Sequence, residues 1–342
     1  SQQLLLEKTG VLLPSGYGLL AHYANRRLGK VPSDAAGFCG ILEYVTSRLV
    51  GKPIDKSDPS CLGPFGAFDP ISSTFEERVL LEVLGSKEKQ FLGSCKPFEV
   101  AGYTRDSVAV TYPVGDNQAG FFGLVSDWSR SALVSMGTSG QISLFSTNTE
   151  CPSSMELRPF LGQGYLHVGA TLTAGKAYET LHDLIASILR SAGMDISDEA
   201  VFDLMKKEGK NKGIPGSLSV DTRFNGSRKE PNVRGSIGPV NLENLTFGNL
   251  VLGTIDGIVD ELYQFGLESG QVFDAIESIV ATGSSVRKNL LFREALNRKF
   301  NRSTIVAQVD DGAGFGAALI GAVAIGALSL PQVKTVVASM IR

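Results

Sequence analysis

Apolar residues recur at helical spacing in the first third of the chain. The first such stretch begins after Asp34, which can cap a helix, and ends before Gly51. Its apolar positions follow the 3.6-residue period: Phe38, Ile41, Leu42, Val45 and Leu49. We therefore expect an amphipathic helix there. A second helix is expected between Thr74, which can form a capping box with Glu77, and Gly85.

The pattern changes to β-branched residues at Ser107. The stretch 107–114 predicts a strand, Gly115 and Asp116 follow it, and residues 117–124 have a helical pattern. An acidic residue therefore lies at a strand-to-helix turn. Two more strands are predicted over 132–136 and 141–145, joined with hairpin spacing by a small polar turn over 137–140.

Helix and strand patterns alternate through the second half. Helices are predicted over 176–190, 199–207, 246–265 and 289–299 and after Gly312, and strands over 278–281 and 305–309. This alternation indicates an α/β architecture. Residues 211–238 are rich in Gly, Ser, Asn and Arg, show neither period, and are predicted to form a long loop. We place a domain boundary near Ser129.

Composition indicates a folded chain of two domains. It has 342 residues, of which 43% are hydrophobic and 20% charged. The 32 basic and 35 acidic residues give a net charge of -3, so no basic face is expected for nucleic acid or an anionic membrane. The longest apolar stretch, 317–330, is shorter than the roughly 20 residues of a membrane span. No transmembrane segment is expected.

Cysteine and histidine usage excludes the common zinc sites. Four cysteines are far apart with no CxxC pair, and only three histidines are present. We expect buried free thiols in a reducing compartment, which favours the cytosol.

Two short segments could carry chemistry before the midpoint. Asp116, held between a strand and a helix, could take a proton from a hydroxyl, although an ordinary helix cap has the same position. Residues 137–140, Gly-Thr-Ser-Gly, offer backbone N–H groups and two hydroxyls to a phosphate chain, and a plain hairpin turn is the alternative.

Three segments of the second half are further candidates. Residues 283–285, Gly-Ser-Ser, open a helix after a strand, where an anion or nucleotide can bind, or simply form a turn. Residues 312–317 match the dinucleotide pattern GxGxxA, but no acidic residue follows Asp311, so close helix packing is favoured. Four basic residues of the long loop could attract a phosphorylated ligand or only solvate a surface: Arg223, Arg228, Lys229 and Arg234.

Five segments, taken in order and spacing, resemble the FGGY family of carbohydrate kinases. They are GDNQAG at 115–120, GTSG at 137–140, TAGK at 173–176, GSSVRKN at 283–289 and DGAGFGAA at 311–318. Within that family the chain is most similar to the sedoheptulokinases, through residues 9–18, 57–69 and 137–141.

The resemblance implies an α/β, two-domain actin-like (ribonuclease H-like) ATPase fold. Residues 1–128 would form the sugar side with the catalytic acid, and residues 129–342 the nucleotide side. The family's first phosphate-binding motif, Asp-x-Gly-Thr-[Ser/Thr], and its Trp-x-Asp-x-Arg-like sugar motif do not occur in these residues. The first domain is therefore expected to be incomplete, which puts catalysis by this chain alone in question.

The resemblance also implies roles for ten residues. Asp116 would be the general base and Asn117 a sugar contact. The nucleotide would be bound by Gly137, Thr138, Ser139, Gly175, Gly283, Ser284, Ser285 and Asn289. The family uses ATP with Mg²⁺, and no protein metal ligand is expected.

The expected reaction is phosphorylation of sedoheptulose to sedoheptulose 7-phosphate. Another acceptor such as xylulose, ribulose or glycerol, or a noncatalytic module that binds nucleotide or sugar, remains open. The expected partners are the sugar and ATP, with a homodimer as an open alternative.

Overall fold

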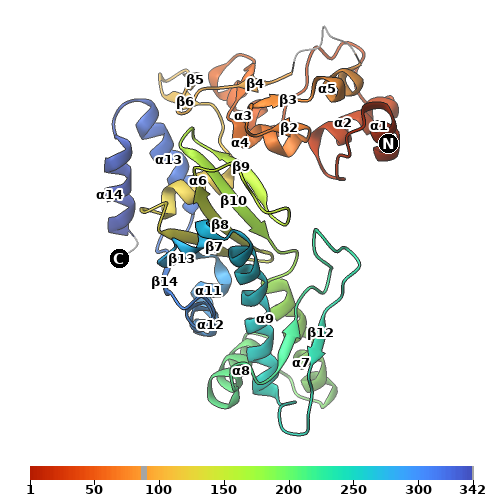
Figure 1. Cartoon of the computed structure of the whole chain (residues 1–342), viewed down its shortest axis with the longest axis vertical. Coiled ribbons are helices and arrows are strands. Elements are labelled where there is room, and N and C mark those ends of the chain that lie inside the picture. The colour runs from red at the N-terminus through yellow and green to blue at the C-terminus, as the bar shows by residue number, and fades with distance from the viewer. Residues whose placement is uncertain (86–90, 341–342) are drawn as a thin grey trace.

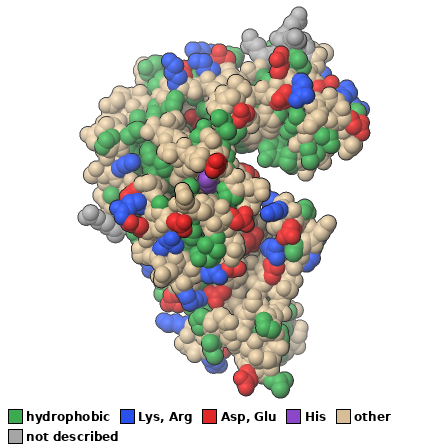
Figure 2. Space-filling view, in the orientation of Figure 1, with side chains coloured by type: hydrophobic (Ala, Val, Ile, Leu, Met, Phe, Trp, Pro, Cys, Tyr) green, Lys and Arg blue, Asp and Glu red, His purple; other side chains and the backbone are tan. Residues whose placement is uncertain are grey.

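The computed structural model describes residues 1–85 and 91–340. Figure 1 shows the N-terminal part at one end of the long axis, a mixed sheet in the middle, and helices α7, α8 and α9 at the other end. In the space-filling view an open notch separates the N-terminal part from the rest, and acidic and basic side chains are interspersed over the visible face (Figure 2).

The central sheet has six strands in the order β14-β13-β7-β8-β10-β9. They are β7 (Ser131–Met136), β8 (Gly140–Ser146), β9 (Glu156–Phe160), β10 (Gly164–Ala170), β13 (Ser278–Thr282) and β14 (Ser303–Val306). Strand β13 is parallel to both β7 and β14, whereas β7, β8, β10 and β9 pair antiparallel in turn. The α/β architecture expected from the sequence is confirmed.

Helices cover both faces of this sheet. On one face, α7 (Gly175–Ser191), α8 (Asp198–Lys212), α9 (Phe247–Glu268) and α12 (Leu290–Phe300) share a hydrophobic core with Val134 and Ile142. On the other face, α6 (Asp116–Leu124), α13 (Gly312–Ala324) and α14 (Leu330–Met340) share a core with Leu133 and Phe160. Neighbouring residues of β7 therefore face opposite cores, as strand geometry requires.

The N-terminal part has its own hydrophobic core and only short strands. Helices α1 (Gln2–Thr9), α2 (Gly18–Arg27) and α5 (Glu77–Leu84) contribute Leu5, Leu19 and Val79 to that core. The strand pairs are β1 (Lys56–Ser57) with β4 (Gly93–Ser94), β2 (Phe68–Asp69) with β3 (Thr74–Phe75), and β5 (Val100–Tyr103) with β6 (Ala109–Thr111). A short helix, α4 (Pro59–Leu62), runs into a 3-10 turn at Gly63–Phe65.

Helix α3 (Ile41–Val50) differs from the sequence expectation in its start and its orientation. It begins at Ile41 because the Glu43 carboxylate accepts the backbone N–H of Gly40 at 2.9 Å, closing a capping box well after Asp34. Glu43 and Thr46 are buried, and Glu43 also accepts the Ser57 hydroxyl at 2.6 Å. The apolar side chains are exposed instead: Ile41, Leu42, Tyr44, Val45 and Leu49.

The long loop predicted over 211–238 was wrong in part. It contains the antiparallel pair β11 (Ser219–Asp221) and β12 (Ser236–Gly238). Strand β11 approaches α9 so closely that a Cβ atom added at Gly257 would lie 1.9 Å from the carbonyl oxygen of Val220.

The strands β9 and β10 and the helix α14 were not predicted at all. Two short helices, α10 (Gln271–Asp274) and α11 (Ser284–Lys288), complete the fold.

Three other expectations can be compared with the structure. All four cysteines are free, with Cys61 and Cys95 buried as expected and Cys39 exposed. No helix in the described part of the chain is long and apolar enough to cross a membrane. The domain boundary near Ser129 stays a prediction, and one hydrophobic core joins residues on both sides of it, such as Phe121 and Leu133.

Candidate functional site

Asp116 is the first residue of α6 and is exposed. The preceding Gly115 is extended, and its N–H donates to the Ser60 hydroxyl at 2.9 Å, which fixes the turn to the N-terminal part. One carboxylate oxygen of Asp116 accepts the backbone N–H of Asn117 at 2.7 Å. The position at a helix N-terminus stabilises the negative charge while the carboxylate stays accessible to a ligand.

Asn117 ties the start of α6 to the central sheet. Its Nδ2 atom donates to Gln141 Oε1 at 3.2 Å and to Ser143 Oγ at 2.9 Å, both on β8. Its Oδ1 atom is buried and has no hydrogen-bond partner within the described residues. Asn117 therefore holds the helix in place and leaves an acceptor unsatisfied.

Close packing against α13 fixes the other end of α6. A Cβ atom added at Gly123 would lie 2.6 Å from the backbone nitrogen of Gly316, so both positions need glycine. The structure therefore confirms that the GxGxxA segment at 312–317 serves close helix packing. Asp311 caps α13 by accepting the Gly314 N–H at 2.8 Å.

A cavity of about 750 Å³ lies beside Asp116. Its walls come from α6, from the four strands β7, β8, β9 and β13, from α11 and from the start of α13. Asp116 and Asn117 lie on one side and the predicted nucleotide residues Gly283 and Ser284 on another. The structure thus brings the predicted base and part of the predicted nucleotide segment to one cavity.

The turn between β13 and α11 depends on Gly283. Its φ of +103° is strained for any side chain, and an added Cβ atom would lie 2.3 Å from the carbonyl oxygen of Met136. The turn therefore lies directly on the end of β7. Ser284, the next residue, is exposed at the start of α11.

Gly137, Thr138, Gly175 and Ser285 form a second group that does not line the cavity with Asp116. The N–H of Gly175 donates to the carbonyl oxygen of Gly137 at 2.9 Å, and the N–H of Lys176 donates to that of Thr138 at 3.1 Å. A Cβ atom added at Gly175 would lie 3.1 Å from Ser285 Oγ. The side chains of Thr138 and Ser139 are exposed at the tip of the turn.

Asn289 has a place in the fold that the sequence did not indicate. It is only 5% exposed, and its Oδ1 accepts the Leu291 N–H at 3.1 Å as the N-cap of α12. Its Nδ2 atom donates to the Tyr178 hydroxyl at 3.2 Å. Burial raises the pKa of Tyr178 to about 12, so this hydroxyl stays protonated. The buried Asn289 side chain therefore has a structural role next to α11.

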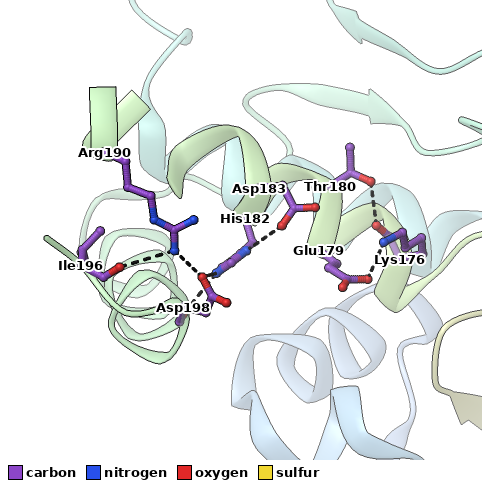
Figure 3. Close-up of polar contacts among 8 residues, drawn as sticks. All are labelled: Lys176, Glu179, Thr180, His182, Asp183, Arg190, Ile196 and Asp198. Carbon is purple, nitrogen blue, oxygen red and sulfur yellow. Dashed lines mark hydrogen bonds and ion pairs between the residues drawn. The ribbon is translucent and has the colours of Figure 1, made fainter. Parts of the chain in front are cut away.

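Helix α7, which begins at Gly175, makes polar contacts along its own length and with α8 (Figure 3). Arg190 donates to the carboxylate of Asp198, and His182 lies between Asp183 Oδ1 at 3.0 Å and the carbonyl oxygen of Asp198 at 3.1 Å. The His182 ring stacks on Phe202 with centroids 4.0 Å apart. These contacts attach α7 to α8, further along α7 than the contact between Gly175 and the 137–140 turn.

A larger cavity of about 980 Å³ lies between α9, β11 and the loop after β11. Arg223, Arg228 and Lys229 from the predicted basic cluster line it, whereas Arg234 does not. Arg223 is already bound to Asp221 and Glu230. Burial raises the pKa of Glu261, which also lines this cavity, to about 7, with Arg223 opposing the shift. No pattern in the sequence indicated Glu261 as a site residue.

Several residues of the cavity beside Asp116 were missed by sequence reasoning. Arg158, Gln141, Ser135, Arg287 and Asp310 all line it. The Arg287 guanidinium is bound by Asp310 and by the carbonyl oxygen of Val309. Only Gln141 and Arg287 lay in segments that the sequence analysis had singled out, 137–141 and 283–289.

The described residues hold no group of three or more His, Cys, Asp or Glu side chains arranged to bind a metal ion.

Comparisons with known proteins bear on the fold. No profile of a protein family matches the chain, and no curated protein matches it. Solved structures do match. A xylulose kinase from Rhodospirillum rubrum has a TM-score of 0.79 at 18% identity, over 98% of this chain and 68% of that one.

Two other kinase structures match similarly. A gluconate kinase from Lactobacillus acidophilus has a TM-score of 0.79 at 19% identity, covering 98% of this chain and 68% of that one. A Plasmodium falciparum glycerol kinase with ADP has a TM-score of 0.74 at 16% identity, covering 98% and 69%. The chain therefore has the actin-like α/β fold of carbohydrate kinases and corresponds to about two thirds of their length.

Proposed function

We propose that the chain is an ATP-dependent carbohydrate kinase that phosphorylates a ketose, with sedoheptulose giving sedoheptulose 7-phosphate. The observation that carries the proposal is the shared cavity, because Asp116 lies on its wall together with Gly283 and Ser284. Solved structures of the same fold include kinases of xylulose, gluconate and glycerol, which supports an acceptor with several hydroxyl groups.

In this proposal Asp116 accepts the proton of the acceptor's primary hydroxyl. The hydroxyl oxygen then attacks the γ-phosphorus of Mg-ATP, the bond to the β–γ bridging oxygen breaks, and ADP leaves. Phosphoryl transfer depends mainly on positioning and on donors that balance negative charge. Asp116 has a fixed place because α6 is tied to β8 and packed on α13.

The nucleotide would lie over the ends of β7 and β13. The exposed turn with Thr138 and Ser139 would offer donors to the phosphates, and Gly175, Ser284 and Ser285 would line the path of the nucleoside. Asn289 would act by supporting the turn, since its side chain is buried in contact with Tyr178. Use of ATP fits the cytosolic location expected from the sequence, and a homodimer stays a prediction.

Sugar-dependent ADP release by the purified chain tests the proposal. Sedoheptulose should support turnover and gain one phosphoryl group by mass, and xylulose, ribulose, glycerol and gluconate define the preference. Asp116→Asn should lower kcat by roughly two to four orders of magnitude with little effect on nucleotide affinity. Asp127→Asn, an exposed acidic residue outside both cavities, is the matched control. Nucleotide binding without turnover on any acceptor would favour the noncatalytic module.

A further inference from the structure

A row of three charged side chains joins the two cavities. Arg158 on β9 donates from Nε and Nη2 to one oxygen of Glu156, at 2.9 and 2.6 Å. The other carboxylate oxygen of Glu156 accepts Arg228 Nη1, from the loop after β11. Arg158 lines the cavity beside Asp116, and Arg228 lines the larger cavity.

Arg158 lies on the sheet face that carries α6. Residues at every second position of a strand share a face, so Arg158 and Phe160 lie on the same face of β9. The Phe160 ring packs against the ring of Phe121 on α6, with the ring centroids 5.4 Å apart. The carbonyl oxygen of Pro159 accepts Gln118 Nε2 at 3.1 Å. Strand β9 is therefore fastened to α6 two residues from Asp116, and the positions of Arg158 and Asp116 are coupled.

The charge of the row is not balanced. One carboxylate, Glu156, faces two guanidinium groups, so the row has a net charge of +1. Side-chain exposure is only 26% for Arg158 and 35% for Glu156, so their interaction is partly shielded from solvent. Arg158 Nη1 has no acceptor within the described residues, which leaves N–H donors for a ligand.

The other cations of this cavity are less suited to an acceptor. Arg287 lies on α11, next to the proposed nucleotide segment, and is bound by Asp310 and by the carbonyl oxygen of Val309. Lys288 is exposed on α11, next to the proposed nucleotide segment. Arg158 is the cation that comes from the strand fastened to the helix of Asp116.

We propose that Arg158 binds oxygen atoms of the acceptor substrate beside Asp116 and sets acceptor specificity, with Glu156 and Arg228 as positioning residues. This proposal rests on the proposed function. A guanidinium group presents planar, paired donors, which suit hydroxyl and carbonyl oxygens of a ketose and suit a carboxylate even better. The two bonds to Glu156 fix that plane, and Arg228 fixes Glu156 from the other side.

Steady-state kinetics of Arg158→Lys and Arg158→Met test the proposal, with sedoheptulose, xylulose and gluconate as acceptors. Arg158→Met should raise the acceptor KM by about tenfold to a hundredfold, while the ATP KM stays within about twofold. Arg158→Lys keeps the charge but not the planar donors, so it should give an intermediate increase. Arg130→Met removes a different ion-paired arginine, outside both cavities, and is the control.

The positioning residues need a separate measurement. Glu156→Gln and Arg228→Met should each raise the acceptor KM by a few fold. When Glu156→Gln is combined with Arg158→Met, the acceptor KM should rise by less than the product of the two single fold-changes. A purely structural role would lower the melting temperature of these variants without changing KM. An unchanged acceptor KM in Arg158→Met, or an equal rise in the ATP KM, would overturn the proposal.

A failure of the proposed kinase function would give a different experimental result. If the wild-type chain turns over no acceptor, the kinase assignment fails, and calorimetry of the same acceptors with wild type and Arg158→Met then decides the role of Arg158. Weaker binding in the variant sustains that role, and equal binding, or none to wild type, overturns it.

Discussion

Gly316 of α13 lies directly on the carbonyl oxygen of Ala119 in α6, and a Cβ atom added there would lie 1.8 Å from that oxygen. The separation of the two helices therefore depends on a hydrogen atom at this position. Because Asp116 begins α6, the placement of the proposed base depends on the same contact.

Gly316→Ala is expected to push α13 away from α6. We expect a loss of about 1–3 kcal/mol of folding free energy, measured by urea unfolding, and a lower kcat from displacement of Asp116. Gly321→Ala in the same helix is the control, since nothing lies within 4 Å of its added Cβ. That variant should gain about 0.5–1 kcal/mol from helix propensity. Equal behaviour of the two would contradict the packing argument.

Gly283→Ala is expected to distort the turn between β13 and α11. The added methyl would meet the backbone of Met136 at a φ of +103°, so we expect a loss of about 1–3 kcal/mol and weaker ADP binding by calorimetry. Gly137→Ala meets no atom within 4 Å and should fold as stably as wild type. If Gly283→Ala binds ADP normally, the turn is not part of the nucleotide site.

The exposed face of α3 leads to a prediction opposite to the one from its sequence pattern. Val45 is 46% exposed and Val83 of α5 is fully buried. Val83→Ala should cost about 2 kcal/mol, whereas Val45→Ala should change the stability by less than about 0.5 kcal/mol. Thermal unfolding of both variants distinguishes them. A similar cost at Val45 would mean that the apolar face is buried in solution.

Glu261 should make stability depend on pH. Burial raises its pKa from 4.5 to about 7, so the folded protein keeps a proton that the unfolded chain loses between these values. Stability therefore falls as pH rises from 4.5 through 7, by at most about 3 kcal/mol. Glu261→Gln should remove most of this slope in urea unfolding and be the more stable protein above pH 7. An unchanged slope would mean that solvent reaches the carboxylate.

Local chemistry was enough to predict the turn that carries Asp116. A β-branched run, then Gly115, then a helical pattern indicated α6 to within one residue of its observed start. The same kind of signal located β7, β8 and the turn between them, because their residues repeat at the strand period and the hairpin spacing is short.

Tertiary context decided what the sequence did not indicate. Pro159 argues against a strand, yet β9 forms because it lies at the edge of the sheet, where a missing N–H is tolerated. Arg158 was therefore overlooked, and its proximity to Asp116 follows from strand order. The orientation of α3 also depended on a long-range contact, the hydrogen bond between Ser57 and Glu43.

The outward face of α3 also has a consequence for how the protein behaves as a solute. Water in contact with Ile41, Tyr44 and Leu49 is released when any apolar surface covers them, and near room temperature that release is driven by entropy. Contacts made through this face should strengthen on warming from the cold and in sulfate, and weaken in urea. Light scattering at matched protein concentrations would therefore respond to temperature and salt type more than to ionic strength.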